Sequence, residues 1–399
     1  MALRELVNKI VPIKEDFSIK SLLGFKKTPL NVLVFFMIMG LLLLLVWGLA
    51  QFLMHGHHSY NVTREHPWGL LISGYIFFVG TSTGLCIIAS LGHVFGIKEF
   101  NHIGKRTTLL AIITLLPGFI IILTEIGHPV TMMIYNILTP GITSAIWWMG
   151  TLYGLVLTFI FLEFGLALRG EHKWAVRFGI GGLIADVAAF TTLGSVFAYL
   201  VARPIANGPF IPLYFLLTAV VSGAFFMFMI YGFKHKLNFP KEVEVTLVKL
   251  AKILGLLLVV TMFFEWWRFI TAIYGGMPER ADTMMKIISS SSFWIEMLFA
   301  WAIPFVIILV SKGKAIKALF FAAIPALISI FLMRNDMVHH AQMKPMLMLK
   351  KTEYQLPPTW IEYFPSSVEW AIAVGALGVC FLLYYVAEKA FNLDEDDHH

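Results

Sequence analysis

Ten long apolar segments alternate with short polar connections along the chain. A segment needs about 20 mostly apolar residues to cross a membrane as a helix. The connections are short except for residues 334–365, where prolines and methionines leave room for local structure. We therefore predict an all-α polytopic membrane protein. Its ten transmembrane helices are expected at residues 31–53, 68–95, 107–126, 143–168, 175–201, 211–233, 249–274, 291–311, 315–333 and 366–390.

The composition agrees with this class. Hydrophobic residues make up 58% of the 399 positions and charged residues only 14%. A soluble chain of this length could not bury so much apolar surface in one core. Cys86 and Cys380 lie inside apolar segments and form no C-x-x-C pair, which excludes a disulfide framework and an iron–sulfur ligand set. The expected partner is therefore the lipid bilayer and not nucleic acid.

The basic residues predict an orientation in the membrane. Residues 1–30 are polar and basic, so no cleavable signal peptide is expected. Most of the 30 Lys and Arg residues lie in this segment, the even-numbered loops and the C-terminal tail. Cytoplasmic loops carry the positive excess in membrane proteins. We therefore expect both termini in the cytoplasm, the turn at 125–150 on the outer face, and a location in the cytoplasmic (inner) membrane.

A weak internal repeat in the sequence suggests how the helices are grouped. The second and sixth helices are both followed by a basic inner loop, which favours two four-helix bundles, helices 2–5 and 6–9, with helices 1 and 10 peripheral. The expected parts are a cytoplasmic segment (1–30), a peripheral helix with its outer loop (31–67), the first bundle (68–201), the second bundle (202–333), an outer loop (334–365), and the last helix with an acidic tail (366–399).

Ionisable side chains inside membrane helices cost about 2.5–3.5 kcal/mol each to insert, so each one suggests a function. Glu125 and His128 are three residues apart at the outer end of the third helix, which would place them on one helix face. They could hydrogen-bond the oxygens of a carbonyl- or hydroxyl-bearing ring and pass its protons. The alternative is that they only cap the helix before Pro129.

Aromatic and basic residues are expected near the same outer region. Tyr75 could reach a ligand oxygen, whereas the G-T-S-T-G run at 80–84 has the spacing typical of close helix packing. Trp147 and Trp148 open the fourth helix; one of them could line a ring-binding pocket, although tryptophan is enriched at membrane interfaces in any case. Arg203 could anchor an anionic partner or a ligand oxygen, or it could simply extend its charge into water.

Two carboxylates lie deeper in the predicted first bundle. Asp186 is near mid-membrane in the fifth helix, and Glu163 lies in the inner part of the fourth. Buried carboxylates of this kind suit a proton path, although a neutral, hydrogen-bonded Asp186 could also only fix helix packing. In the seventh helix Glu265 and Arg268 are three residues apart, and we expect them to form an ion pair.

The histidines do not predict a haem. His93 is at the inner end of the second helix and His128 at the outer end of the third, too far apart to share one iron. His55, His57, His58 and His66 follow the first helix in a loop, where a metal ion could bind but haem would not be expected. We therefore predict no haem, no metal site and no iron–sulfur cluster in this chain.

Four motifs, taken together and in order, resemble the NrfD/polysulfide reductase membrane subunit (PsrC-like) family. They are G-Y-I-F-F-V-G-T-S-T-G-L at 74–85, E-I-G-H-P at 125–129, S-A-I-W-W-M-G at 144–150 and A-R-P-I-A-N-G-P-F-I-P at 202–212. The likeness covers helices 2–5 well and 6–9 loosely. The ten-helix length resembles the DsrP, HmeB, QrcD and alternative complex III members, and the short loops favour the DsrP type, which acts in sulfur or sulfite metabolism.

The resemblance implies a quinone site in the first bundle near the outer surface. It implies no redox cofactor in this chain, a ferredoxin-like iron–sulfur subunit docked on the outer face, and cytochrome subunits in the same complex. By motif position the quinone headgroup would lie near Tyr75, Glu125, His128, Trp147 and Arg203, with Asp186 and Glu163 on the proton path. This family often has Arg where this chain has His128, which leaves His128 as a possible proton acceptor.

These observations predict the quinone-interacting membrane subunit of a respiratory oxidoreductase complex. It would exchange electrons between menaquinol, or another quinol, and an iron–sulfur partner outside the cytoplasm, with Tyr75, Glu125 and His128 as the catalytic residues. A secondary transporter or proton-conducting protein is the alternative, because sparse carboxylates in ten helices fit that class too. A purely structural membrane anchor is a third possibility.

Overall fold

The computed structural model describes residues 12–14, 17, 18, 22, 24, 28–344 and 360–394. Every regular element in these ranges is helical, and ten helices are long and apolar enough to cross a membrane, as predicted. Most of the N-terminal segment, the middle of the 334–365 loop and the end of the acidic tail lie outside the described residues.

The ten long elements are α3 (Pro29–His55), α4 (Leu70–His93), α6 (Gly104–Glu125), α8 (Ala145–Leu168), α9 (His172–Ala198), α10 (Phe210–Lys234), α11 (Lys241–Tyr274), the continuous run α13 (Ser291–Glu296), η2 (Met297–Ala302) and α14 (Ile303–Ser311), α15 (Ile316–His340) and α16 (Ser367–Ala390). Shorter elements are η1 (Gly56–Ser59), α5 (Lys98–Asn101), α7 (Pro129–Leu138) and α12 (Pro278–Ile288).

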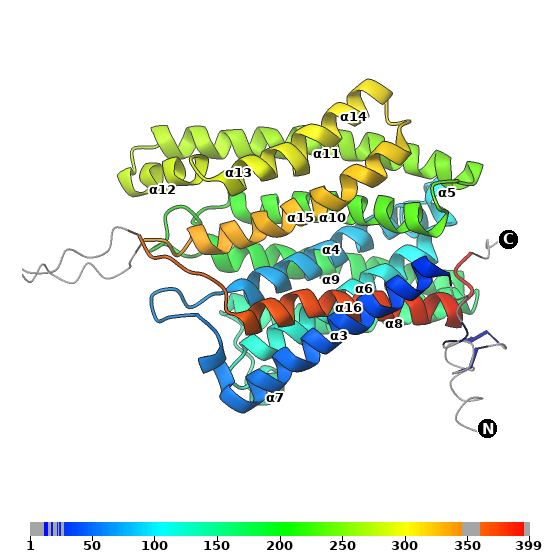
Figure 1. The fold of residues 1–399 in the computed structure, drawn as a ribbon, viewed down its shortest axis with the longest axis horizontal. Helices are drawn as coiled ribbons and strands as arrows, with labels where there is room; N and C mark the ends of the chain where they lie inside the picture. Colours follow the sequence, from blue (N-terminus) through cyan, green and yellow to red (C-terminus); the bar gives the residue numbers. More distant parts are fainter. Residues whose placement is uncertain are drawn as a thin grey trace, which may run out of the picture.

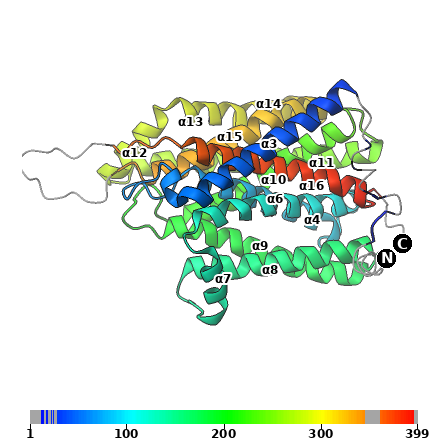
Figure 2. The same ribbon diagram turned by 60° about the horizontal axis from the view of Figure 1, so that its bottom comes forward.

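The long helices run side by side along the longest axis of the molecule (Figure 1). We call the end where α6 stops the Glu125 end, on the left in Figure 1, and the end where α16 stops the Ala390 end. At the Glu125 end α7 projects from the side of the bundle beside α8 (Figure 2).

Helix α4 lies at the centre and packs against α6, α9, α10, α15 and α16. Helix α8 packs against α9 and α6, while α11 packs against α10, α14 and α15. Helix α3 packs against α16 and exposes apolar side chains such as Leu33, Phe36 and Leu43, which suit contact with lipid.

Glycine allows α4 and α10 to approach each other closely. A Cβ added at Gly84 would lie 1.9 Å from the carbonyl oxygen of Ala219, and one added at Gly223 would lie 2.5 Å from the carbonyl carbon of Gly84. Gly80 is equally confined, because a Cβ there would meet the ring of Phe190 at 2.7 Å. The packing role predicted for the G-x-x-x-G run is therefore confirmed.

Two predicted helix boundaries were wrong, and one short helix was not predicted. Helix α15 continues to His340 instead of ending at 333, because its polar last turns are held by contacts that hydropathy does not show; Arg334 donates to Thr218 on α10 at 2.6 Å. The outer turn contains α7, whose ten residues are too short to span a membrane and none of which is buried. The helix predicted at 249–274 begins earlier, at Lys241.

Candidate functional site

Two buried tyrosines face each other between α4 and α8. Tyr75 is 3% exposed, and its ring meets the edge of Tyr153 with 6.3 Å between the ring centroids. Phe119 of α6 meets the same Tyr153 ring at 5.9 Å. The hydroxyl groups of Tyr75 and Tyr153 are close enough to interact, but among the described residues the Tyr153 hydroxyl forms no hydrogen bond of normal geometry. A buried hydroxyl without a partner costs about 1–3 kcal/mol, so this position suits a ligand oxygen.

Asp186 of α9 lies close to the same region. Its side chain is 1% exposed; Thr83 of α4 donates to its Oδ1 at 2.8 Å, while its Oδ2 has no partner among the described residues. Both Tyr75 and Asp186 are near enough to Tyr153 to interact with it electrostatically. The structure thus brings together Tyr75 and Asp186, two predicted residues from different helices, through Tyr153, which the sequence did not single out.

Glu163 of α8 occupies a second buried position, nearer the Ala390 end. Its Oε1 lies 3.5 Å from His93 Nδ1, and Thr108 donates to the same oxygen at 3.5 Å. The backbone of Gly179 makes room for this carboxylate, because a Cβ there would lie 3.1 Å from Oε1. Cys86 interacts electrostatically with both Asp186 and Glu163.

Glu125 and His128 do not share a helix face, contrary to the prediction. Helix α6 ends at Glu125, and His128 caps the start of α7 with non-helical backbone angles (φ −133°, ψ 70°). The His128 side chain is exposed, whereas that of Glu125 is half-buried. His57 of the loop after α3 hydrogen-bonds the backbone carbonyl of Glu125 at 2.9 Å, which holds this loop against the end of α6.

The position of Tyr75 relative to Glu125 follows from the packing of α4 on α6. A Cβ added at Gly118 would lie 3.2 Å from the Cβ of Phe78, and one added at Gly74 would lie 3.4 Å from the Ile121 side chain, so Tyr75 is level with the part of α6 between Gly118 and Ile121. Glu125 is four to seven residues further along α6, about 6–10 Å at 1.5 Å per residue. A ligand ring beside Tyr75 would therefore need an intervening group or water to reach Glu125.

Trp147 and Arg203 are both held by the chain itself. The Trp147 indole donates to the backbone carbonyl of Asn136 at 2.7 Å, which fixes α7 against α8. Arg203 is 8% exposed and donates to the backbone carbonyls of Lys344 and, at 3.5 Å, Glu65. Burial lowers the pKa of Arg203 from its ordinary value. Arg203 thus ties together three loops at the Glu125 end, and the structure places neither residue against Tyr75.

Two cavities open between the helices away from these residues. One, of about 300 Å³, lies between α4, α6, α10, α15 and α16 and has an almost wholly apolar lining that includes Phe77, Phe331 and Leu377. The other, of about 30 Å³, lies at the Glu125 end between α10, α11, α13 and α15 and has a charged lining. None of the five predicted headgroup residues lines either cavity.

Sequence reasoning missed Tyr153, Thr83 and the contact of His93 with Glu163. Tyr153 lies in an apolar helix where one more aromatic residue gives no signal. Thr83 belongs to the G-x-x-x-G run and was assigned to packing alone, although its hydroxyl also reaches Asp186. His93 was considered only as a haem ligand. Thr191 and Thr192 of α9 donate to backbone carbonyls of their own helix.

Buried carboxylates and tyrosines inside ten spanning helices define a multi-pass integral membrane protein with a polar interior. The chain belongs to the NrfD family, described as polysulphide reductase, NrfD, whose model matches residues 57–345. This confirms the family suggested by the motifs and places the chain among membrane subunits of oxidoreductase complexes.

Three curated relatives are similar to this chain. A selenate reductase subunit from Mesobacillus selenatarsenatis is 24% identical and aligns over 94% of this chain and 96% of its own length. The Hdr-like menaquinol oxidoreductase integral membrane subunit of Archaeoglobus fulgidus is 25% identical over 84% and 86%. A protein of Halobacterium salinarum named as a dimethyl sulfoxide reductase membrane subunit is 26% identical over 55% and 56%.

Proposed function

We propose that this chain is the quinone-reactive membrane subunit of a respiratory oxidoreductase complex, with the ring of the quinone held between α4, α8 and α9. The buried Tyr153 hydroxyl without a partner carries this proposal, because it lies beside Tyr75 and Asp186 on the two neighbouring helices. A quinone or quinol offers ring oxygens that accept or donate hydrogen bonds. The relative from Archaeoglobus fulgidus, named as a subunit of a menaquinol oxidoreductase, supports menaquinol as the substrate.

The residues of the site suggest a division of labour. Tyr75 and Tyr153 orient the ring oxygens by hydrogen bonding, and Phe119 closes the site on one side. The free oxygen of Asp186 accepts a proton from a ring hydroxyl. On full oxidation a quinol gives up two electrons and two protons, and the electrons pass to a redox centre in a partner subunit. In the direction of quinone reduction Asp186 returns the proton to the ring.

Two proton routes lead away from Asp186. One runs through Cys86 to Glu163 and His93 toward the Ala390 end. The other runs toward Glu125, which lies about 6–10 Å along α6 from the level of Tyr75, and then to the exposed His128, so we assign both to proton transfer after the ring and not to contact with it. We assign Trp147 and Arg203 to holding the loops around this end. The residues predicted at the quinone headgroup thus keep a role, but of the five only Tyr75 contacts the ring. Glu125 and His128 carry protons, and Trp147 and Arg203 hold the loops.

The remaining features follow the same proposal. We propose that an iron–sulfur subunit docks at the Glu125 end, that cytochrome subunits complete the complex, and that the protein resides in the cytoplasmic membrane with the Glu125 end outward. Selenate and dimethyl sulfoxide reductase relatives widen the range of terminal reactions beyond sulfur or sulfite metabolism. Membership in the NrfD family favours this class over a secondary transporter.

Tyr153→Phe tests the proposal most directly. In the purified complex this change should lower quinol-dependent electron transfer mainly by raising KM for the quinol analogue, because one hydrogen bond to the ring is lost. The matched control is Tyr274→Phe, since Tyr274 is 82% exposed at the end of α11 in the other half of the molecule. If both variants oxidise quinol like the wild type while retaining the native complex, the site between α4, α8 and α9 is wrong.

A further inference from the structure

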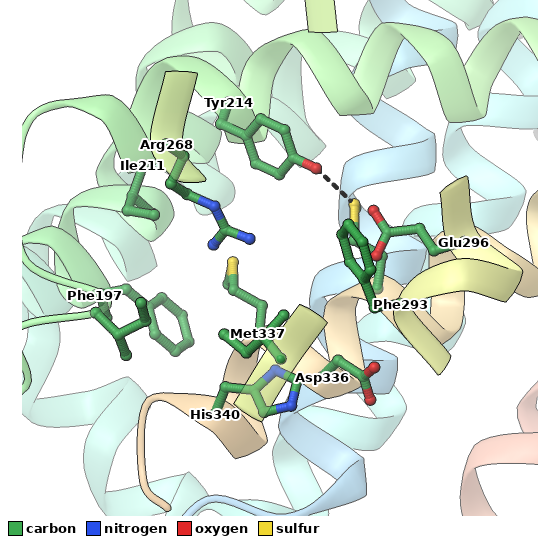
Figure 3. Close-up of a pocket in the computed structure, with 13 residues that line it drawn as sticks. Phe197, Ile211, Tyr214, Arg268, Phe293, Glu296, Asp336, Met337 and His340 are labelled. Atoms are coloured by element: carbon green, nitrogen blue, oxygen red, sulfur yellow. Dashed lines mark hydrogen bonds between the residues drawn. The ribbon is translucent and has the colours of Figure 1, made fainter. Parts of the chain in front are cut away.

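The charged cavity at the Glu125 end lies outside the proposed quinone site. Its polar lining comes from Tyr214 on α10, Arg268 on α11, Glu296 on α13, and Asp336 and His340 on α15, and Figure 3 shows these side chains around one central space. A volume of about 30 Å³ is enough for one or two water molecules, given the 10–15 Å³ that each requires.

The charges around the cavity do not all pair. Arg268 and Glu265 form an ion pair within α11, as predicted, and thereby neutralise each other. Arg334 is 1% exposed and donates to the Thr218 hydroxyl at 2.6 Å and the Phe215 carbonyl at 3.5 Å. No carboxylate among the described residues forms an ion pair with it, and its Nη1 has no partner there. Arg334 is therefore a buried cation that lacks a fixed counter-ion.

Glu296 is the acid whose charge can balance Arg334. It is 5% exposed, and its Oε1 accepts a hydrogen bond from Trp301 Nε1 at 3.1 Å. It interacts electrostatically with Arg334 without forming an ion pair with it. An isolated buried charge is energetically unfavourable. The protonation state of Glu296 therefore decides whether the positive charge of Arg334 is balanced or in excess.

The backbone is irregular at this glutamate. The π-helix η2 begins at Met297, directly after Glu296. Its i→i+5 hydrogen-bonding pattern brings residues five apart onto one face, which puts the Trp301 indole next to the Glu296 carboxylate. Short π-helical turns occur frequently at functional sites. An ordinary α-helix would carry this indole about 100° further around and would lose the contact.

We propose that Glu296 is a second proton-exchange site, which takes up and releases a proton through water held in this cavity. Asp336, half-buried, and His340 lie one turn apart on α15 and lead from the cavity toward the Glu125 end. The charged groups that interact electrostatically with Glu296 are Glu265, Arg268, Asp336 and Arg334, with Arg280 of α12 near Arg268. Proton uptake converts the Glu296 carboxylate to the neutral acid, and release returns the proton to cavity water.

Infrared difference spectroscopy of the full chain in lipid nanodiscs, without added quinone, tests this site. When the pH is lowered, the wild-type protein should gain a protonated-carboxyl C=O band, and this band should shift in D₂O because cavity water exchanges with bulk water. Glu296→Gln should remove one D₂O-sensitive component of this band, whereas the components of other buried acids such as Asp186 should remain. The matched control Asp282→Asn changes a carboxylate that is 65% exposed and should leave the band in place.

A second variant keeps the test informative if Glu296→Gln fails to fold. Trp301→Phe preserves the carboxyl group but removes its hydrogen bond, so the band should remain and change frequency. A spectrum in which Glu296→Gln removes no component, the removed component is insensitive to D₂O, or Trp301→Phe shifts no component would overturn the proposal. Because no quinone is present, its failure would not bear on the quinone site, and the failure of the quinone site would not bear on it.

Discussion

The two halves of the molecule bury their acids in different ways. Around α4, α8 and α9, Asp186 is held by a threonine hydroxyl, and Glu163 by a threonine and a histidine, with no arginine bound to either among the described residues. Around α11, α13 and α15, Glu265 is paired with Arg268, and Glu296 interacts electrostatically with the buried Arg334 without an ion pair. An acid held by neutral hydroxyls can gain a proton without leaving a cation unbalanced, whereas protonation of Glu265 would leave Arg268 without its counter-ion.

This difference separates two kinds of chemistry. The first region suits proton exchange with a neutral ring, since its protein groups can all be neutral at once. In the second region the charge of two guanidinium groups is permanent, because arginine does not lose its proton in proteins. We therefore expect acids of the first region to affect turnover and the paired acid of the second region to affect stability.

The largest effect is expected at Asp186. Asp186→Asn keeps the size of the side chain but removes the proton acceptor, so quinol-dependent electron transfer in the assembled complex should fall on the order of 10²-fold or more. Thr83 can still donate to the amide oxygen, so folding should be preserved. Steady-state kinetics should show the loss in kcat, and Asp186→Glu should restore part of it. Wild-type turnover in the asparagine variant would remove Asp186 from the reaction.

Removal of Glu265 should have the opposite profile. Glu265→Gln leaves Arg268 buried without its partner, which costs about 3–5 kcal/mol for a buried pair. The midpoint of thermal unfolding in detergent should fall clearly, while turnover per assembled complex should stay near that of the wild type. The double variant Glu265→Leu/Arg268→Met should recover most of the stability, since it removes both charges. A catalytic defect larger than the stability defect would contradict the comparison.

Much of the fold could be predicted because lipid imposes it. A span that leaves no backbone group unsatisfied must be a long apolar helix, so ten such segments in the sequence yield ten such helices in the structure. The Glu265–Arg268 pair was predictable for a similar reason, since i,i+3 neighbours on one helix are local in sequence. The end of α15 could not be predicted in this way. Its polar turns are stabilised by the hydrogen bond from Arg334 to Thr218, and these two residues are 116 positions apart in the chain.

The candidate site was only partly predictable. Asp186 was suggested by the cost of burying a carboxylate, but its partner Thr83 is separated from it by 103 residues, a pairing that one sequence does not reveal. Tyr153 became a candidate only because the structure shows that its buried hydroxyl lacks a hydrogen bond of normal geometry among the described residues. The Glu125–His128 spacing misled because the helix stops between the two residues, so the i,i+3 rule no longer applies to them.

The smallest effect concerns the contact that joins the two halves at the Glu125 end. The Nε2 atom of His66, just before α4, lies 2.9 Å from Nδ1 of His339 on α15. The His66 ring stacks on Tyr363 with 4.4 Å between the ring centroids. Burial, together with His339 and Arg203, lowers the pKa of His66 from 6.5 to about 4. The folded protein thus keeps His66 neutral, while the unfolded chain binds a proton below about pH 6.5.

Stability should therefore decrease as the pH falls from about 6.5 toward 4, because the unfolded state binds more protons in this window; the loss attributable to His66 is roughly 1–3 kcal/mol. His66→Phe keeps the ring that stacks on Tyr363 but cannot titrate, so the difference in unfolding midpoint between wild type and variant should narrow as the pH falls from 7 to 4. The exposed His58 serves as control, and His58→Gln should leave the wild-type pH dependence unchanged. If the stability of His66→Phe depends on pH in the same way as that of the wild type, the contact between the two halves does not depend on a neutral His66. The two halves then respond to acid through their buried carboxylates.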